Sequence, residues 1–412
     1  MTGTTCCIVG GGPAGMVLGL LLARAGVSVT VLEKHADFLR DFRGDTVHPT
    51  TMSLLEELGL AERFAELPQN RIDRVAIPVG PEGRSQLLAD FRRAPLKYDY
   101  VAMVPQWDLL NLLAEEARRE PNFTLLMSSE VLGPLREHGR VNGVLYRRTD
   151  GSTERLRATL TVACDGRDSF ARRIPETRPR TYPTPMDVRW FRLPRRQGDP
   201  RGVYASISGG AFTVLLDRHD YYQVASVIPK DSDAEERHRP VEEFNERLRR
   251  RLPWLDDGRE LVRDWEDVRL LHVKLDRLRR WHVPGLLCIG DAAHAMSPVG
   301  GIGINLAVQD AVAAARHLAD PLRRGRLRRH HVAAVQRRRK PVTALLQRAQ
   351  RAVHDNVVEP GLRGDIDFGT RVGLPLPLRL LPRIPLLRAI PPYVFAYGAL
   401  PERPPNSALR HG

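Results

Sequence analysis

The first part of the chain alternates short apolar runs with glycine-containing turns. Residues 6–10 and 27–32 are apolar and predict two buried strands. Between them, residues 14–25 have the length and apolar content of a helix, which Gly26 would end. A strand, a helix and a second strand in this order predict a βαβ unit, the building block of a parallel sheet.

The rest of the chain shows two kinds of sequence pattern. Helices are predicted at 49–58, 107–118, 240–251 and 304–318, and apolar strands at 75–79, 86–91, 123–127, 141–147, 160–163 and 286–289. Another group of runs alternates or is rich in β-branched and aromatic residues, at 187–193, 202–208, 211–216 and 221–228. This second group predicts an antiparallel sheet rather than further βαβ units.

We therefore expect an α/β fold in which a β-sheet domain interrupts a nucleotide-binding domain. The expected nucleotide-binding domain comprises residues 1–73, 98–180 and 264–340, and the sheet domain comprises 74–97 and 181–263. The remaining segment, 341–412, includes a stretch at 374–392 whose prolines forbid one long helix. We expect short helices there, packed on the body of the protein rather than on a membrane surface or a partner.

The charge of the chain changes this picture little. The formal net charge is +14, from 63 basic and 49 acidic residues. Only five of the basic residues are lysines, so the charge reflects an arginine bias of the kind that a GC-rich genome produces, and we expect no nucleic-acid partner. The densest basic run, 323–340, lies in a helical pattern and favours a solvated helix face over a polyanion site.

The cysteines and the N-terminus indicate the compartment. The four cysteines lie in apolar runs without disulfide or zinc spacing, which predicts buried thiols in a reducing compartment and no metal site: Cys6, Cys7, Cys164 and Cys288. The N-terminus lacks the basic region of a signal peptide, and the apolar segment 17–22 is too short to cross a bilayer. We expect a cytoplasmic protein, as a monomer or a homodimer.

A glycine turn follows the first predicted strand. In Gly10-x-Gly12-x-x-Gly15 the first glycine permits a tight bend, the second lets the backbone approach a pyrophosphate, and the third lets the helix pack on the strand. Pro13 and Ala14 begin the helix, whose N-terminal N–H groups attract a phosphate. Because the turn lies between a strand and a helix, it favours a dinucleotide site over a glycine-rich turn without a ligand.

The second predicted strand ends at Glu33, which Lys34 follows. A carboxylate at this position can accept hydrogen bonds from the two ribose hydroxyls of a bound nucleotide. It also disfavours an adenosine 2′-phosphate, because the two negative charges repel.

A second glycine-rich segment lies almost three hundred residues downstream. Gly290-Asp291 follows the predicted strand 286–289, so the aspartate sits at a strand end, where it can accept a hydrogen bond from a ribityl hydroxyl. The glycines of the segment 298–305 precede a helix, and their N–H groups can face the electron-rich edge of a ring. We expect Asn305 to cap this turn or to touch the ring, and His294 to support the loop rather than to act as an acid or base. The two glycine segments together suggest FAD.

With a third motif, these segments resemble a known family. The third motif is Cys164-Asp165-Gly166-Arg167-Asp168-Ser169, followed by Arg172. Over about residues 5–310 the chain is similar to the class A flavoprotein monooxygenases of the para-hydroxybenzoate hydroxylase type. The resemblance implies a Rossmann-like FAD-binding domain interrupted by an antiparallel substrate sheet and followed by C-terminal helices.

The resemblance also implies roles for single residues. Asp165 would interact with both FAD and NAD(P)H, and Arg43 would lie in a mobile loop beside the flavin. Gln106 matches a glutamine near the FAD phosphate and ribityl region, and Val131 follows the strand whose backbone meets adenine. The loop beneath the pyrimidine edge of the flavin is matched by Pro298, Gly301, Gly303, Ile304 and Asn305.

The reaction that the resemblance implies needs no protein nucleophile and no metal. NADH or NADPH, bound transiently without a Rossmann domain of its own, would reduce FAD. O₂ would then give a flavin C4a-hydroperoxide that hydroxylates an aromatic or polycyclic substrate, such as a phenolic secondary metabolite. The substrate would lie between flavin and sheet, where candidate residues are Trp190, Tyr204, Phe212, Tyr221 and Tyr222. Because side chains alternate along a strand, about half of these must face away.

Other activities remain open at this stage. A Baeyer–Villiger or epoxidising oxygenase and a prenyl-chain reductase share these features, and a non-catalytic flavin-binding sensor is the alternative outside enzymology. A flavin halogenase is disfavoured because no Trp-x-Trp-x-Ile-Pro motif is present, and a disulfide reductase because no cysteine pair has redox spacing. The sequence does not identify the substrate or choose between NADH and NADPH.

Overall fold

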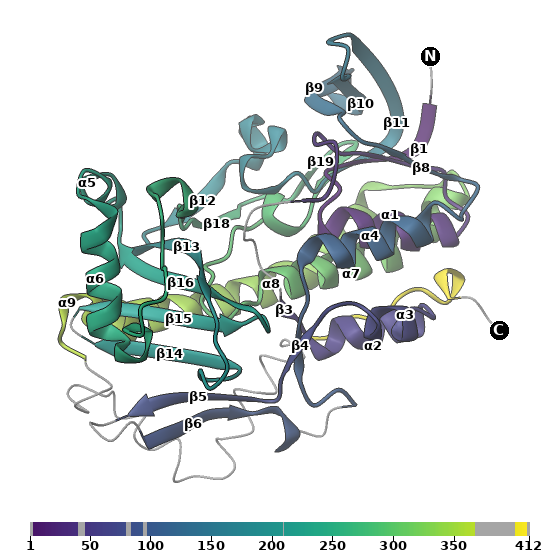
Figure 1. Cartoon of the computed structure of the whole chain (residues 1–412). Helices are drawn as coiled ribbons and strands as arrows, with labels where there is room; N and C mark the ends of the chain where they lie inside the picture. Colours follow the sequence, from purple (N-terminus) through teal and green to yellow (C-terminus); the bar gives the residue numbers. More distant parts are fainter. Residues whose placement is uncertain are drawn as a thin grey trace.

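The structure, a computed structural model, describes residues 3–39, 46–79, 84–93, 97–208, 210–366 and 400–409. Figure 1 shows a helix-rich domain with a largely parallel sheet beside a domain built on an antiparallel sheet. Arg43, the turn 80–83 and the proline-rich stretch 374–392 lie outside the described residues, so the predictions made for them stay predictions.

The first domain is built on a sheet with the strand order β19-β20-β11-β1-β2-β8. Its strands are β1 (Gly3–Val9), β2 (Val29–Leu32), β8 (Phe123–Leu126), β11 (Thr153–Ala163), β19 (His282–Val283) and β20 (Leu286–Cys288). β1 pairs in parallel with β2 and β11, and these two pair in parallel with β8 and β20. The turns that follow β1, β2, β11 and β20 therefore meet at one edge of the sheet. β9 (Glu130–Glu137) and β10 (Arg140–Arg147) extend β11 in the antiparallel sense.

A layer of helices covers this sheet. It contains α1 (Pro13–Arg24), α4 (Gln106–Ala117) and α7 (Gly303–Arg323), with α1 packed against both others. α1 is buried along almost its whole length and carries no charge before Arg24, as expected for a helix enclosed on all sides. A Cβ at Gly19 would lie 2.9 Å from the Phe123 ring, which explains a glycine inside this helix.

The second domain is a five-stranded antiparallel sheet with the order β14-β15-β16-β13-β17. Its strands are β13 (Met186–Pro194), β14 (Val203–Ser208), β15 (Ala211–Asp217), β16 (Tyr221–Pro229) and β17 (Arg269–Leu271). α6 (Val241–Arg251) covers one face, where Phe244 and Leu248 pack on Phe191 and Leu193. α5 (Asp233–Arg237) lies beside α6 (Figure 1).

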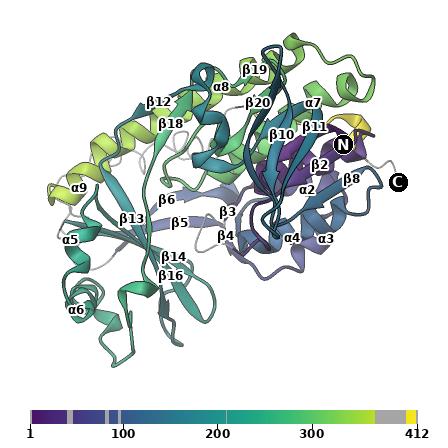
Figure 2. The same ribbon diagram turned by 90° about the horizontal axis from the view of Figure 1, so that it is seen from above.

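Smaller sheets and two helices join the domains. The sheets pair β3 (Thr46–Val47) with β7 (Val101–Met103) and β4 (Asn70–Ile72), β5 (Arg74–Val79) with β6 (Arg84–Asp90), and β12 (Pro179–Tyr182) with β18 (Leu275–Leu278). The helices are α2 (Pro49–Glu57) and α3 (Ala61–Ala65). A long arm follows: α8 (Arg329–Val353), a π-helical turn (His354–Val358) and α9 (Glu359–Arg363). Figure 2 shows this arm running from the first domain to the second sheet.

The structure confirms the predicted fold class, an α/β domain combined with a separate antiparallel sheet and C-terminal helices. Other details differ from expectation, among them several short elements that were not predicted, such as α3, β4 and β7. β11 begins at Thr153, seven residues before the predicted strand, and β9 was not predicted. α8 runs from Arg329 to Val353 and so includes residue 340, and the predicted domain bounds stay a prediction. Among the described helices, none is both long and apolar enough to cross a membrane.

Candidate functional site

The glycine turn after β1 lies directly against the end of β11. Gly10 has a φ of 102°, and an added Cβ would lie 2.6 Å from the Cys164 oxygen and 2.8 Å from the Asp165 Cα. Only glycine fits this position. Gly12 is the N-cap of α1, where an added Cβ would meet nothing within 4 Å. The first and third motifs thus border an open cradle at a helix N-terminus, the geometry that binds a phosphate.

Glu33 points at this cradle from the end of β2. Its Oε2 accepts a hydrogen bond from the Gly11 N–H (2.8 Å), and its Oε1 accepts one from the His35 N–H (3.1 Å). The carboxylate is buried, with 6% of the residue exposed, whereas Lys34 is exposed. Two backbone donors fix both oxygens, and because a carboxylate oxygen can accept more than one hydrogen bond, this position suits a ligand hydroxyl as a further donor.

Asp165 carries an unsatisfied oxygen. Its Oδ2 accepts a hydrogen bond from the Phe170 N–H (3.0 Å), whereas its Oδ1 is buried and makes no hydrogen bond within the described residues. Burial raises the pKa of this carboxyl. A buried acceptor without a donor is costly in a folded protein. The arrangement therefore fits a ligand that brings a hydroxyl or another donor to Oδ1.

Arg172 connects the third motif to the second. Its guanidinium binds both oxygens of Asp276 (2.7 and 2.8 Å) and donates to the main-chain oxygen of Asp291 (2.7 Å). Arg172 follows β11 and Asp276 lies on β18. This bidentate pair is mostly buried and geometrically specific, so it fixes the turn that carries Asp291.

The loop 298–305 is held by residues of β3 and α2. The oxygen of Gly301 accepts a hydrogen bond from the Thr46 hydroxyl (2.8 Å), and the His48 Nε2 lies 3.0 Å from the same oxygen. The Asn305 Oδ1 accepts from the hydroxyls of Thr50 (2.7 Å) and Thr51 (3.1 Å). The Asn305 Oδ1 is therefore already engaged by two hydroxyls. If Asn305 caps the turn or touches a ring, as we expected, another atom of the residue must take part.

The same loop leaves space at the start of α7. Gly300 and Gly301 have φ values of 88° and 61°, and Gly303 has nothing within 4 Å of an added Cβ. Pro298 and Ile304 are partly buried on either side of this turn. A second helix N-terminus thus faces open space, as the sequence led us to expect for a site that receives a ring edge.

The contacts of His294 fit the expected supporting role. It is buried, and its Nε2 lies 2.6 Å from the Asp310 Oδ2, which also accepts from the Gly290 N–H (3.1 Å). The other oxygen of Asp310 accepts from the Arg339 Nε (2.9 Å), and Arg339 also lies 3.4 Å from Glu402. Sequence reasoning missed Asp310 and Glu402 and assigned Arg339 to a solvated face, because nothing local marks a buried ion pair.

Two predicted residues lie on elements that frame the edge. Gln106 is the first residue of α4, and Val131 lies on β9 opposite Tyr146; both are partly buried. Their proposed contacts to a ligand stay predictions.

Of the five candidate substrate residues, Tyr221 begins β16 with the Arg192 guanidinium 4.8 Å from its ring centroid, and the other four divide between the two faces of the second sheet. Trp190 and Phe212 lie in one apolar cluster with Val299 of the 298–305 loop. Tyr204 and Tyr222 pack on the opposite face, where both contact Trp254. Strand alternation turns Tyr204 and Tyr222 toward α6 and away from the face that carries Trp190 and Phe212, so the geometry favours the latter pair for a site beside the loop, and the substrate roles of all four stay predictions.

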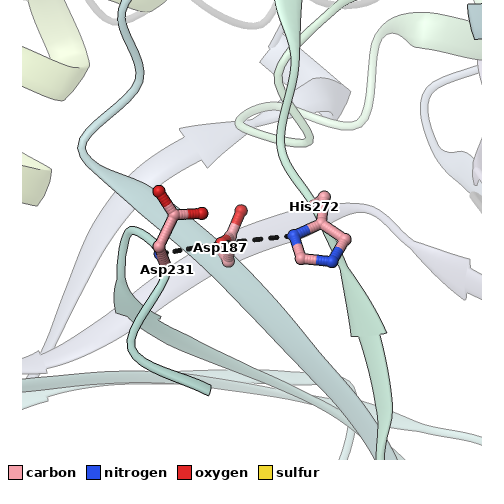
Figure 3. A group of neighbouring side chains, drawn as sticks. All are labelled: Asp187, Asp231 and His272. Atoms are coloured by element: carbon pink, nitrogen blue, oxygen red, sulfur yellow. Dashed lines mark hydrogen bonds and ion pairs between the residues drawn. The ribbon is translucent and has the colours of Figure 1, made fainter. Parts of the chain in front are cut away.

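Figure 3 shows Asp187, Asp231 and His272, which gather close enough to suggest a cation site. The Asp187 carboxylate already receives the Lys230 ammonium (2.7 Å) and the N–H groups of Val273 (2.8 Å) and Asp231 (3.1 Å). An ammonium therefore supplies the positive charge that a metal would bring, and the cluster is an ion pair at the start of β13.

Comparison with known proteins agrees with this geometry. The family model described as "FAD binding domain" matches residues 3–349. The chain is 35% identical to 6-methylpretetramide 4-monooxygenase of Streptomyces rimosus over 352 residues, covering 84% of this chain and 82% of that protein. It is 28% identical to anhydrotetracycline monooxygenase of Streptomyces rimosus, covering 74% of this chain and 60% of that protein. The structure of the flavin-dependent brominase Bmp2 superposes with a TM-score of 0.76 at 17% identity, covering 97% and 94% of the two chains, a likeness of fold alone.

Proposed function

Because the chain belongs to the FAD-binding class A flavoprotein monooxygenases, we propose that it uses NADPH or NADH and O₂ to oxygenate a polycyclic phenolic substrate. The observation that carries this proposal is the 35% identity to 6-methylpretetramide 4-monooxygenase along most of both chains. The matching family model spans residues 3–349, which include the second sheet as well as the nucleotide-binding domain.

FAD fits the residues present at the sheet edge. The cradle at Gly12 would take the pyrophosphate, Glu33 the adenosine ribose, and Asp291 a ribityl hydroxyl. The buried Asp165 Oδ1 would gain the donor that it lacks in the protein alone. The open turn before α7 would lie beneath the ring. When bound, FAD supplies two-electron transfer from a nicotinamide to O₂, and the protein binds, orients and excludes water.

The substrate would lie between the 298–305 loop and the sheet face that carries Trp190 and Phe212. This face is apolar and aromatic, and Val299 packs on it. Such a surface suits a flat, fused-ring substrate, whose faces stack on aromatic side chains. A halogenase with the same fold is not proposed, because the five tryptophans contain no Trp-x-Trp pair: Trp107, Trp190, Trp254, Trp265 and Trp281.

The test begins with the purified chain and added FAD. We expect a yellow protein whose flavin is reduced by NADPH or NADH in the absence of O₂. In the presence of O₂, 6-methylpretetramide is expected to accelerate nicotinamide oxidation and to gain one oxygen atom. A protein that binds FAD but is reduced by neither nicotinamide would contradict the proposal and favour a flavin-binding sensor.

A further inference from the structure

The arm formed by α8, the π-helical turn and α9 contacts both halves of the proposed site. Near its middle, Gln347 donates to the main-chain oxygens of Asp276 (2.7 Å) and Ala295 (3.1 Å) in the first domain. At its far end, Val358 and Leu362 pack in the apolar cluster of the second sheet. Figures 1 and 2 both show the arm extending from the first domain to the second sheet.

Between these two contacts, Gln350 holds the start of the 298–305 loop. Its Nε2 donates to the oxygens of Ser297 (2.9 Å) and Val299 (2.7 Å), and its Oε1 accepts from the Ser297 N–H (3.2 Å). The side-chain amide therefore pairs with Ser297 as a neighbouring strand would. Gln350 is 4% exposed, so these bonds do not compete with water.

His354 holds the same residue one helical turn later. Its Nε2 lies 2.8 Å from the Ser297 Oγ, which in turn accepts from the Val299 N–H (3.3 Å). His354 is 1% exposed and begins the π-helical turn, a form that is rare in helices and common at functional sites. The turn leads directly to Val358, a member of the apolar cluster on which Trp190 and Val299 also pack.

We propose that Gln350 and His354 are positioning residues that set the gap between the loop beneath the flavin ring and the substrate face of the second sheet. Gln350 and His354 hold Ser297 and Val299 by hydrogen bonds. The arm that carries these two residues packs on the second sheet through Val358. The proposal rests on the proposed function, since it assigns the loop to the ring of FAD. No contact of either side chain with FAD is involved.

The experiment compares Gln350→Met and His354→Leu with the unchanged full-length chain. Methionine preserves the length of the side chain and removes the three hydrogen bonds. Both variants are expected to bind FAD with a Kd raised by no more than about tenfold, because the pyrophosphate and ribose contacts stay. The visible circular dichroism and the midpoint potential of bound FAD are expected to shift, since the donors around the ring move. With substrate, more NADPH is expected to end as H₂O₂ rather than as product.

Two further variants separate positioning from stability. Asn245 on α6 pairs with the N–H and the oxygen of Val262 on the far side of the second sheet, as Gln350 pairs with Ser297. Asn245→Leu is expected to lower thermal stability like Gln350→Met while leaving the flavin dichroism unchanged. His354→Gln, which can still bond Ser297, is expected to restore part of the signal.

An unchanged flavin spectrum and potential in both Gln350→Met and His354→Leu would overturn the proposal, as would equal changes in Asn245→Leu. The proposed function fails separately, if the unchanged chain binds FAD but does not oxidise NADPH or NADH. The dichroism of bound FAD reports on the loop in either case.

Discussion

At the scale of single residues, a buried polar atom without a hydrogen bond marks a ligand site only together with its surroundings, because His294, His354 and Glu402 carry such atoms as well. Asp165 has one such oxygen, although its other oxygen and its neighbours are well bonded. Asp310 shows the opposite case, a buried carboxylate both of whose oxygens have partners: Gly290 and His294 at Oδ2, and Arg339 at Oδ1. Asp310 is fully buried and Asp165 only partly, but the clearer difference between the two acids is that Asp165 keeps a buried oxygen without a hydrogen bond.

Asp165→Asn is expected to weaken FAD without weakening the protein. The amide oxygen can still accept from the Phe170 N–H, and the charge that burial penalises is gone. Loss of a charged acceptor for a ligand hydroxyl costs about 1.5–3 kcal/mol, or about tenfold to a hundredfold in Kd. Flavin fluorescence titration and thermal unfolding of the FAD-free chain measure the two effects. A falling unfolding temperature together with an unchanged Kd would contradict this role.

His354 predicts a pH dependence of stability. Burial lowers the pKa of its imidazole, so the unfolded chain binds a proton at a higher pH than the folded chain does. The resulting loss of stability begins as the pH falls through the unfolded value, about 6.5, and continues down to the folded pKa. Asp355 opposes this shift, and His282 and His317, whose pKa values are also lowered, add to the total. His354→Gln is expected to flatten the decline between pH 7 and 5 in urea unfolding, and an unchanged slope would contradict it.

At the scale of elements, the sequence predicts what local pattern encodes. The inner half of β11 is apolar and was predicted, whereas its outer half alternates exposed and buried residues and pairs with β10, so it lacks the signature of a buried strand. The helical pattern predicted for 323–340 is interrupted in the structure, because α7 ends at Arg323 and α8 begins only at Arg329, and the burial of Arg339 was not predicted either. The burial of Arg339 depends on partners that are distant in the sequence, such as Glu402, and no local pattern indicates such partners.

The described segment 400–409 gives an element-scale prediction. Glu402 is buried, binds the Arg338 Nε (2.6 Å), and accepts from Arg339 (3.4 Å). Glu402→Gln removes one partner of a buried ion network and is expected to cost about 2–3 kcal/mol in the free energy of unfolding, less than a full break because Arg339 keeps Asp310. The control Glu359→Gln alters an exposed pair with Arg363 and is expected to cost less than about 0.5 kcal/mol. If Glu402→Gln and Glu359→Gln lower the free energy of unfolding in urea by equal amounts, the ion network of Glu402 does not anchor the segment 400–409.

At the scale of the whole molecule, four strand ends bring distant segments to one edge. One residue of the site follows each of these strands: Gly10 after β1, Glu33 after β2, Asp165 after β11, and Asp291 after β20. Because parallel strands end on the same side, the sequence alone predicts that these residues converge. It does not predict which face of the second sheet meets the 298–305 loop. Alternation divides the residues of each strand between two faces, but it does not show which of the two faces lies against the loop.

The two faces of the second sheet therefore make opposite predictions. Trp190→Phe and Phe212→Leu change the face that packs with Val299 and are expected to raise the KM for a polycyclic substrate about fivefold to tenfold, while the Kd of FAD stays the same. Tyr222→Phe removes the hydroxyl that bonds the Pro200 oxygen on the other face, so it is expected to lower stability by about 1 kcal/mol and to leave KM unchanged. Steady-state kinetics and thermal unfolding of the three variants measure these effects. A KM that responds to Tyr222→Phe but not to Trp190→Phe or Phe212→Leu would place the substrate on the α6 face instead.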